Sequence, residues 1–96
     1  MKAYVIVQER VKDEAMFAEY RKDVLPTVEA HGGRFVVRGG TMTVVEGSWP
    51  LPRLVVLEFP SRAAAEGWYH SPAYQKILPL RLKSCEGNLV IVDGPA

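Results

Sequence analysis

The chain has 96 residues and a net charge of +1, so it has room for one domain and no charge excess that would attract nucleic acid or an anionic membrane. Apolar residues make up 48% of it and charged residues 24%, which is typical of a globular protein. We therefore expect a single domain over residues 1–96 and no nucleic-acid partner.

Cys85 is the only cysteine, so the chain can form no internal disulfide and lacks the paired spacing of a zinc site. This favours a reducing, cytoplasmic location. The apolar run at residues 3–7 is too short for the core of a signal peptide, and no run reaches the ~18 apolar residues that cross a membrane. The sequence predicts neither export nor a membrane anchor.

The first predicted element is a strand over residues 3–9, which are rich in β-branched and aromatic side chains. Asp13 is a good N-cap for a helix that carries an apolar stripe at helical spacing. Pro26 should kink or interrupt this helix near its end, and the glycines at 32–33 should stop it. The stripe consists of Phe17, Tyr20, Val24 and Val28.

The second strand is expected at residues 34–38. Gly39 and Gly40 should form a bulge or bend, after which the strand continues through residues 42–46. A proline-braced turn at 47–52 then leads into a third strand at 53–59.

A second helix is expected over residues 62–70, with Ser61 as its cap. The serine and proline directly after it start a short helix, which Pro79 should break. The last strand is expected at residues 88–92.

The order strand, helix, strand, strand, helix, strand predicts a ferredoxin-like α+β fold, βαββαβ, with an antiparallel four-stranded sheet and the helices on one face. Three of the strands contain unbroken apolar runs, at 5–7, 54–57 and 89–92, where a sheet with one wet face would alternate. Something must cover the second face, and a second copy of the chain is the simplest cover. We predict a homodimer built sheet to sheet.

Alternation places Glu58 on that covered face if Leu57 and Phe59 meet the helices. The same alternation in the second strand places Arg38 on that face as well. Because a buried carboxylate needs a partner, this predicts an Arg38–Glu58 ion pair. The pair would either fix the register and the interface or take part in chemistry. A bulge at the glycines would change the parity, so the relation of Arg38 to Glu46 stays open.

In the functional interpretation, Arg38 anchors a carboxylate or enolate oxygen and Glu58 or Glu46 accepts a proton. Trp49 lies between glycine and proline in the turn, where it would be a lid, a pocket wall or an aromatic plug at a subunit contact.

Tyr69, Ser71 and Tyr74 cluster around the break between the two later helices and could form a polar rim of a substrate site. Ser71 is better explained as a helix cap than as a nucleophile. His70 lacks a partner at ligand spacing, so we expect no metal site. Arg81 is either an anion contact or part of a solvated helix face.

The glycine pairs stand outside any phosphate-loop or dinucleotide signature, so no flavin, nicotinamide or nucleotide cofactor is predicted.

The combination of these motifs resembles the small bacterial family named domain of unknown function 1330. The resemblance implies a ferredoxin-like fold that dimerises as an α+β barrel, in a superfamily of cofactor-free monooxygenases, haem-degrading enzymes, lactone isomerases and ligand-sensing domains. The segments that carry it are Arg38-Gly39-Gly40, Val45-Glu46-Gly47 with Trp49, Glu58-Phe59-Pro60-Ser61, Trp68-Tyr69, Ser71-Pro72 with Tyr74, and Arg81. The family's polar pattern falls here on Arg38, Glu46, Glu58, Tyr69, Ser71, Tyr74 and Arg81.

Two functions remain open at this point. The first is a protein that binds or transforms a small acidic organic molecule by proton transfer, as an isomerase or cofactor-free oxygenase does. The alternative is a non-catalytic dimeric ligand-sensing or interaction module, whose sheet charges lock the interface and leave no cavity around Glu58.

Overall fold

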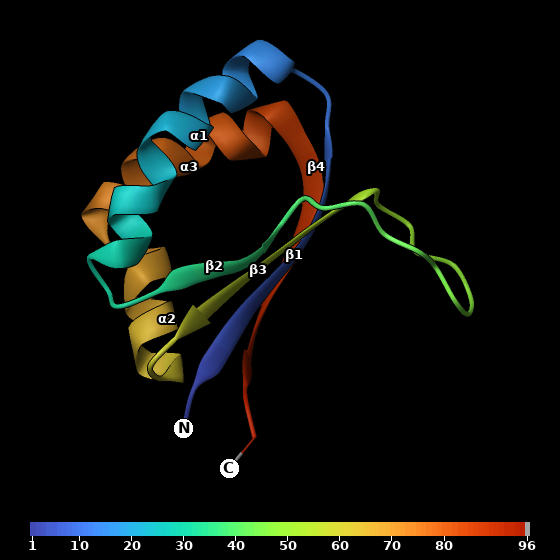
Figure 1. Cartoon of the computed structure of the whole chain (residues 1–96). Helices are drawn as coiled ribbons and strands as arrows, with labels where there is room; N and C mark the ends of the chain where they lie inside the picture. The colour runs from blue at the N-terminus through green and yellow to red at the C-terminus, as the bar shows by residue number, and fades with distance from the viewer. Residues whose placement is uncertain (96) are drawn as a thin grey trace.

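The computed structural model describes residues 1–95, which form one antiparallel sheet with three helices packed on one of its faces (Figure 1). The strands lie in the order β2-β3-β1-β4. This confirms the predicted ferredoxin-like α+β fold. The elements are β1 (Ala3–Val11), α1 (Glu14–Glu29), β2 (Arg34–Arg38), β3 (Arg53–Phe59), α2 (Arg62–His70), α3 (Pro72–Ser84) and β4 (Cys85–Asp93).

Each helix begins at a side chain that accepts a hydrogen bond from the first turn. Asp13 Oδ1 accepts from the backbone N–H of Met16, 3.0 Å away. The hydroxyls of Ser61 and Ser71 do the same at the starts of α2 and α3. These caps satisfy backbone donors that have no partner within the helix.

The two internal prolines do not end their helices. Pro26 lies inside α1, which continues to Glu29, and Pro79 lies inside α3, which runs on to Ser84. The prediction that Pro79 breaks the third helix is therefore wrong. Pro79 is exposed and its neighbours Ile77 and Leu78 are buried, so core packing of the opposite side offsets the lost backbone hydrogen bond.

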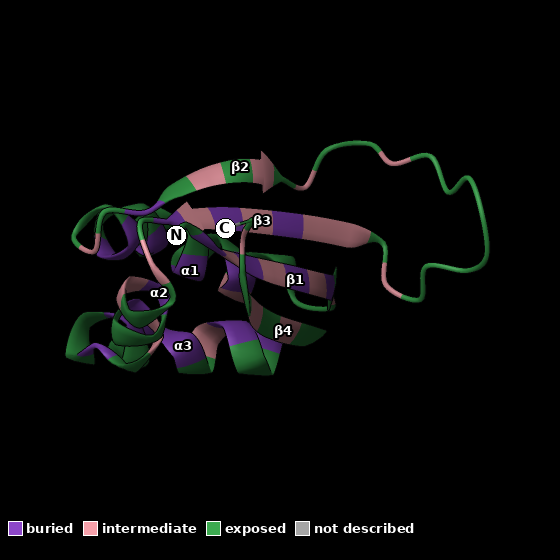
Figure 2. Ribbon diagram, turned by 90° about the horizontal axis from the view of Figure 1, so that it is seen from below, coloured by how far each residue is buried: buried purple, intermediate pink, exposed green. Residues whose placement is uncertain are grey.

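The predicted continuation of the second strand through residues 42–46 is also wrong, because residues 40–52 form a loop. Gly39 adopts a φ of 70°, a conformation that favours glycine, and its N–H donates to the carbonyl of Leu54 at 2.8 Å. That bond closes the pairing of β2 with β3. Beyond it the chain leaves the sheet as a long projection (Figure 2).

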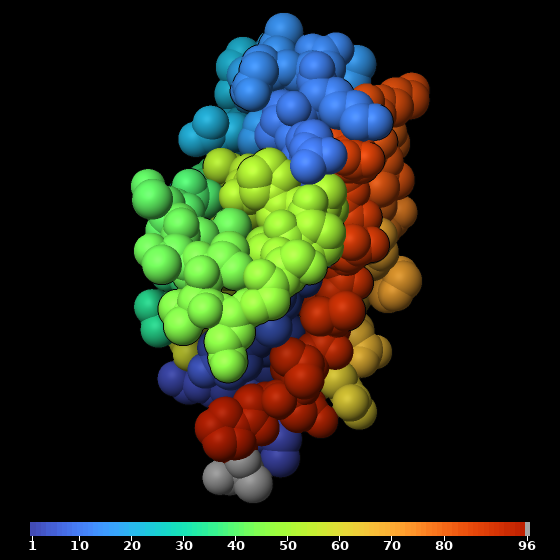
Figure 3. All heavy atoms as spheres, turned by 90° about the vertical axis from the view of Figure 1, so that its right-hand side faces the viewer, coloured from blue at the N-terminus to red at the C-terminus, as the bar shows by residue number. Residues whose placement is uncertain are grey.

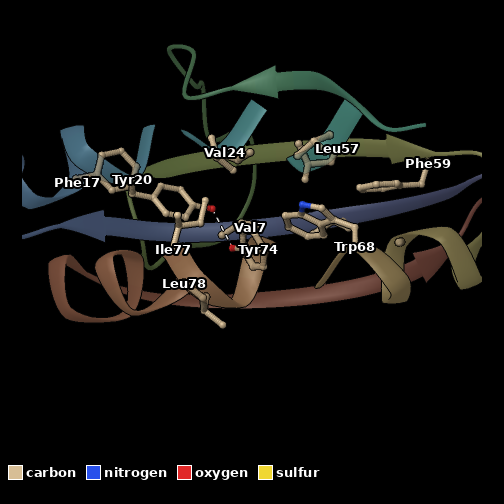
Figure 4. Packing of buried hydrophobic residues seen from close by; sticks show 14 residues of the cluster. Val7, Phe17, Tyr20, Val24, Leu57, Phe59, Trp68, Tyr74, Ile77 and Leu78 are labelled. Atoms are coloured by element: carbon tan, nitrogen blue, oxygen red, sulfur yellow. Dashed lines mark hydrogen bonds between the residues drawn. The ribbon is translucent and has the colours of Figure 1, made fainter. Parts of the chain in front are cut away.

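The core lies between the sheet and the helices (Figure 4). Val55, Leu57 and Phe59 of β3 all point into it, as alternation predicted. Within residues 1–95, no helix covers the opposite, outer face of the sheet, and Val90 and Val92 on it are 55% and 44% exposed. Figure 3 looks at this side, with the loop in front of part of the sheet and β4 open.

Candidate functional site

A cavity of about 30 Å³ lies between the sheet, α1 and α3. Its volume has room for one or two water molecules, so an organic ligand would enter only if side chains at its mouth moved. Its apolar wall includes Phe17, Phe35 and Trp68. Its polar lining consists of Glu9, Tyr20, Arg21, Arg38, Arg53, Tyr74 and Arg81.

Glu9 holds two arginines of this lining in place. Its carboxylate accepts a hydrogen bond from Nε of Arg53 at 3.0 Å and lies 3.5 Å from Nε of Arg81. Glu9 and Arg81 are both buried, at 3% and 6% exposure, so the desolvation of each charge is offset by the other. With a guanidinium at each oxygen, this carboxylate is occupied.

Tyr20 on α1 and Tyr74 on α3 meet beside this ion cluster. Their hydroxyl oxygens lie 2.9 Å apart, and the two side chains point toward one another (Figure 4). Burial raises the pKa of both phenols above the ordinary value. The two groups therefore stay protonated at neutral pH, and because one hydroxyl donates to the other, the pair keeps one hydroxyl proton that can be donated to a ligand.

Arg21 and Arg38 are exposed at the mouth of the cavity. Within residues 1–95, neither has a carboxylate oxygen within 4.0 Å. The Arg38 guanidinium lies 4.1 Å from the ring centroid of Phe35. Its pKa is lowered by partial burial and by the charges of Arg21 and Arg53. This concentration of positive charge around Arg38 favours the binding of an anion.

Arg38 reaches the cavity because β2 contains a bulge. Phe35 pairs with Leu57, but Val37 pairs with Val56, so the register shifts by one residue between them. The shift turns Arg38, opposite Val55, toward the helices. The predicted Arg38–Glu58 pair is therefore wrong: the bulge lies before Arg38 and not at the glycines after it.

Glu58 lies on the outer face, where Arg34 is its partner. Its carboxylate accepts from Nε of Arg34 at 2.9 Å and from the Tyr4 hydroxyl at 3.1 Å, with the Lys2 ammonium 3.6 Å away. The hydrogen bond from Arg34 is the main cause that lowers the pKa of this carboxyl. Glu58 does not line the cavity.

The other predicted site residues are divided between several places. Glu46 and Trp49 lie in the loop after β2 and line a separate, open hollow. Tyr69 is half-buried and lines a surface hollow that also includes Arg81. Ser71 caps α3, and its hydroxyl donates to the carbonyl of Trp68 at 2.7 Å. Of the predicted residues, the structure brings Arg38, Tyr74 and Arg81 together in the cavity.

Four polar residues of the cavity were missed by the sequence analysis, namely Glu9, Tyr20, Arg21 and Arg53. The position of Glu9 could have been recognised from the sequence pattern. It follows Val5 and Val7 at the same two-residue spacing, so a charge occupies a core position of the first strand. Tyr20 was assigned to the apolar stripe, where its hydroxyl was overlooked.

Within the described residues, no three His, Cys, Asp or Glu side chains gather as a metal site requires. None of the helices in residues 1–95 has the length and apolar character needed to span a membrane.

The fold is shared with solved structures of low sequence identity. A Rhodopseudomonas palustris protein of unknown function matches with a TM-score of 0.78 and 18% identity, over 99% of this chain and 83% of that one. A dimeric ferredoxin-like protein of unknown function from Jannaschia sp. CCS1 matches with a TM-score of 0.71 and 17% identity, over 98% and 100% of the two chains. SnoaB, a cofactor-independent oxygenase from Streptomyces nogalater, matches with a TM-score of 0.62 and 7% identity, over 99% and 94%.

No curated protein matches the chain. At these identities, the structural matches show a common fold. The sequence itself matches one family, described as Domain of unknown function (DUF1330), over residues 2–95. The resemblance found in the motifs is thus confirmed, and the chain belongs to this family.

Proposed function

We propose that this protein binds a small acidic organic molecule in the cavity between the sheet and the helices, and that it stabilises an oxyanion of that molecule during a proton-transfer reaction. The observation that carries the proposal is a pair of arginines without a carboxylate partner in residues 1–95, Arg21 and Arg38, at the mouth of a cavity whose one carboxylate, Glu9, is occupied. Four arginines and one glutamate give the lining three excess positive charges.

The roles follow from the position of each group. Arg38 is exposed and has no carboxylate partner in residues 1–95, so it is free to swing outward to admit a ligand and then bind its carboxylate through two parallel hydrogen bonds. Tyr20 and Tyr74 remain protonated and supply a hydroxyl donor to a second oxygen. Arg53 and Arg81, held by Glu9, add positive potential in a poorly hydrated place.

The lining provides hydrogen-bond donors but no unpaired carboxylate to take a proton, because Glu46 and Glu58 lie outside the cavity. The proton acceptor in such a site is a group of the substrate itself or a water molecule. An isomerase or a cofactor-free oxygenase that stabilises an enolate fits this arrangement. The SnoaB structure, a cofactor-independent oxygenase on the same fold, supports the second class.

A second candidate function is a non-catalytic ligand-sensing or interaction module. The observation that favours it is Glu58, whose carboxylate is paired with Arg34, Tyr4 and Lys2 and does not line the cavity between the sheet and the helices. In both cases we propose a cytoplasmic homodimer formed through the outer face of the sheet. The exposed Val90 and Val92 support the dimer, as does the dimeric Jannaschia protein.

Binding of salicylate, a small aromatic carboxylate, tests the proposal, with its uncharged analogue salicylamide as the control ligand. Isothermal titration should show that salicylate binds and salicylamide does not. Arg38→Ala should weaken binding by at least about tenfold, as expected for loss of a charge-assisted hydrogen bond. Arg34→Ala is the matched control, since Arg34 lies on the same strand but on the outer face.

Equal losses in the two variants would place the anion outside the cavity and overturn the proposal. Binding that depends on Arg38 with no turnover of bound carboxylates would favour the sensing module. Native mass spectrometry of protein from its own host should identify the ligand that such a sensing module carries.

A further inference from the structure

Residues 40–52 form an arm that is apolar and exposed. Val45 is 87% exposed, Val44 is 51% exposed and Trp49 is 45% exposed. The arm extends from the outer side of the sheet, away from the helices, and most of its length is exposed (Figures 1 and 2). Within residues 1–95, one hydrogen bond ties it to the rest of the chain, from Nη2 of Arg10 to the carbonyl of Pro50 at 3.4 Å.

The base of the arm is fixed. Gly39 donates to the carbonyl of Leu54 and has a positive φ, and a β-carbon at this position would overlap the Arg53 guanidinium. Arg53 is in turn held by Glu9. The arm therefore leaves the sheet in a defined direction, and its apolar side chains project from an anchored stem.

The arm also encloses a hollow of about 370 Å³ against its own sheet. The arm lines it with four apolar residues, Met42, Val44, Val45 and Trp49, and with the polar Thr43 and Glu46, and Leu54 lines it from β3. The hollow opens to solvent beside the outer face. It offers a mostly apolar site for side chains of another molecule.

The outer face of the sheet has the matching character. Its middle is apolar, with Ile6 paired to Val56 on one side and to Val90 on the other. The charged side chains on this face form ion pairs within the chain. At each end of the face, basic side chains outnumber acidic ones. At one end Lys2 and Arg34 flank Glu58, and at the other Arg10 and Lys12 flank Glu86.

We infer that the arm of one copy packs on the outer face of a second copy, with Trp49 as its anchor. The described part of each chain leaves both the apolar arm and the apolar face uncovered, so a two-fold axis can cover both at once and close the assembly. The one charge of the arm, Glu46, has the sign opposite to the excess on that face. The inference rests on the proposed homodimer and names the segment that holds it together.

Fluorescence can follow this contact, because the chain has two tryptophans and Trp68 is 1% exposed. Acrylamide should quench Trp49 strongly in dilute protein and weakly above the dimer dissociation constant. Trp49→Phe provides the background from Trp68. In sedimentation equilibrium, Trp49→Ala should raise the dissociation constant by at least about tenfold, the loss typical of a buried aromatic anchor.

Leu82→Ala is the matched control, since Leu82 is an apolar residue on α3 that is 60% exposed. It should leave the dissociation constant within about twofold. If a dimer forms but acrylamide still quenches Trp49 and Trp49→Ala leaves the dissociation constant unchanged, the contact of the arm is overturned and the homodimer stands. A monomer at every concentration would overturn both, while salicylate binding to that monomer would leave the ligand proposal intact. A dimer that forms only with a foreign protein bound would also overturn the inference.

Discussion

The hydroxyl oxygens of Tyr20 and Tyr74 lie 2.9 Å apart and join α1 to α3 in the core. Replacement of either residue by phenylalanine leaves the other hydroxyl buried without this partner. We expect Tyr20→Phe or Tyr74→Phe to lower the free energy of unfolding by about 1–3 kcal/mol, measured by urea denaturation.

The double variant should cost less than the sum of the two single variants, because it leaves no orphaned hydroxyl. The difference is a coupling energy of the kind that residues in contact show. Strictly additive losses would mean that the two hydroxyls do not depend on each other.

Glu9 should be the carboxylate whose loss costs the most stability. Glu9→Gln keeps the shape of the side chain but leaves Arg53 and Arg81 partly or fully buried without a countercharge. Removal of one partner from a buried ion pair costs about 3–5 kcal/mol, and we expect a loss of this order in the free energy of unfolding.

The same change at Glu19 is the control, since Glu19 pairs with Lys22 on the surface of α1 and its side chain is 61% exposed. Glu19→Gln should change the free energy of unfolding by less than about 1 kcal/mol. If the two variants are equally stable, the buried cluster contributes no more than a surface pair.

The sequence predicted most elements of the fold because hydrophobic period, caps and glycines are local signals. The beginnings of α1, α2 and α3 follow from Asp13, Ser61 and Ser71, and all three were recognised. The break predicted at Pro79 does not occur, because the core packing that holds α3 together depends on distant parts of the chain.

The site was less predictable, since it depends on register. One bulge within β2 moves Arg38 from the outer face to the cavity, and Glu58 pairs with Arg34, which lies opposite it before the bulge. No residue type marks a bulge at Val36. Glu9 was the one readable clue, as a charge in phase with buried valines.

The link between Glu58 and Arg34 predicts a specific dependence of stability on pH. Because Arg34 lowers the pKa of Glu58 in the folded state, the unfolded chain binds this proton more tightly. The stabilisation is fully present above the unfolded pKa, about 4.3, and is lost as the pH falls through the lower folded value.

Arg34→Ala should therefore be less stable than the wild type at pH 7, and the gap should close as the pH approaches 2. Urea denaturation across this range measures it. Arg38→Ala is the control, because Arg38 has no carboxylate partner within residues 1–95 and its effect should not close in the same window. A constant gap for Arg34→Ala would mean that the pairing does not act through the charge of Glu58.

Gly33 is required for steric reasons at the start of β2. A β-carbon at this position would lie 2.5 Å from Cε1 of Phe59, whose ring is 1% exposed and cannot move aside without disturbing the core. Overpacking of this kind costs about 1–3 kcal/mol, so Gly33→Ala should lower the free energy of unfolding by that amount. Gly40→Ala is the control, since no atom lies within 4 Å of the added carbon, and its effect should stay within about 0.5 kcal/mol. If Gly33→Ala proves as stable as Gly40→Ala in thermal and urea denaturation, the Phe59 ring can yield at this point and the glycine serves another purpose.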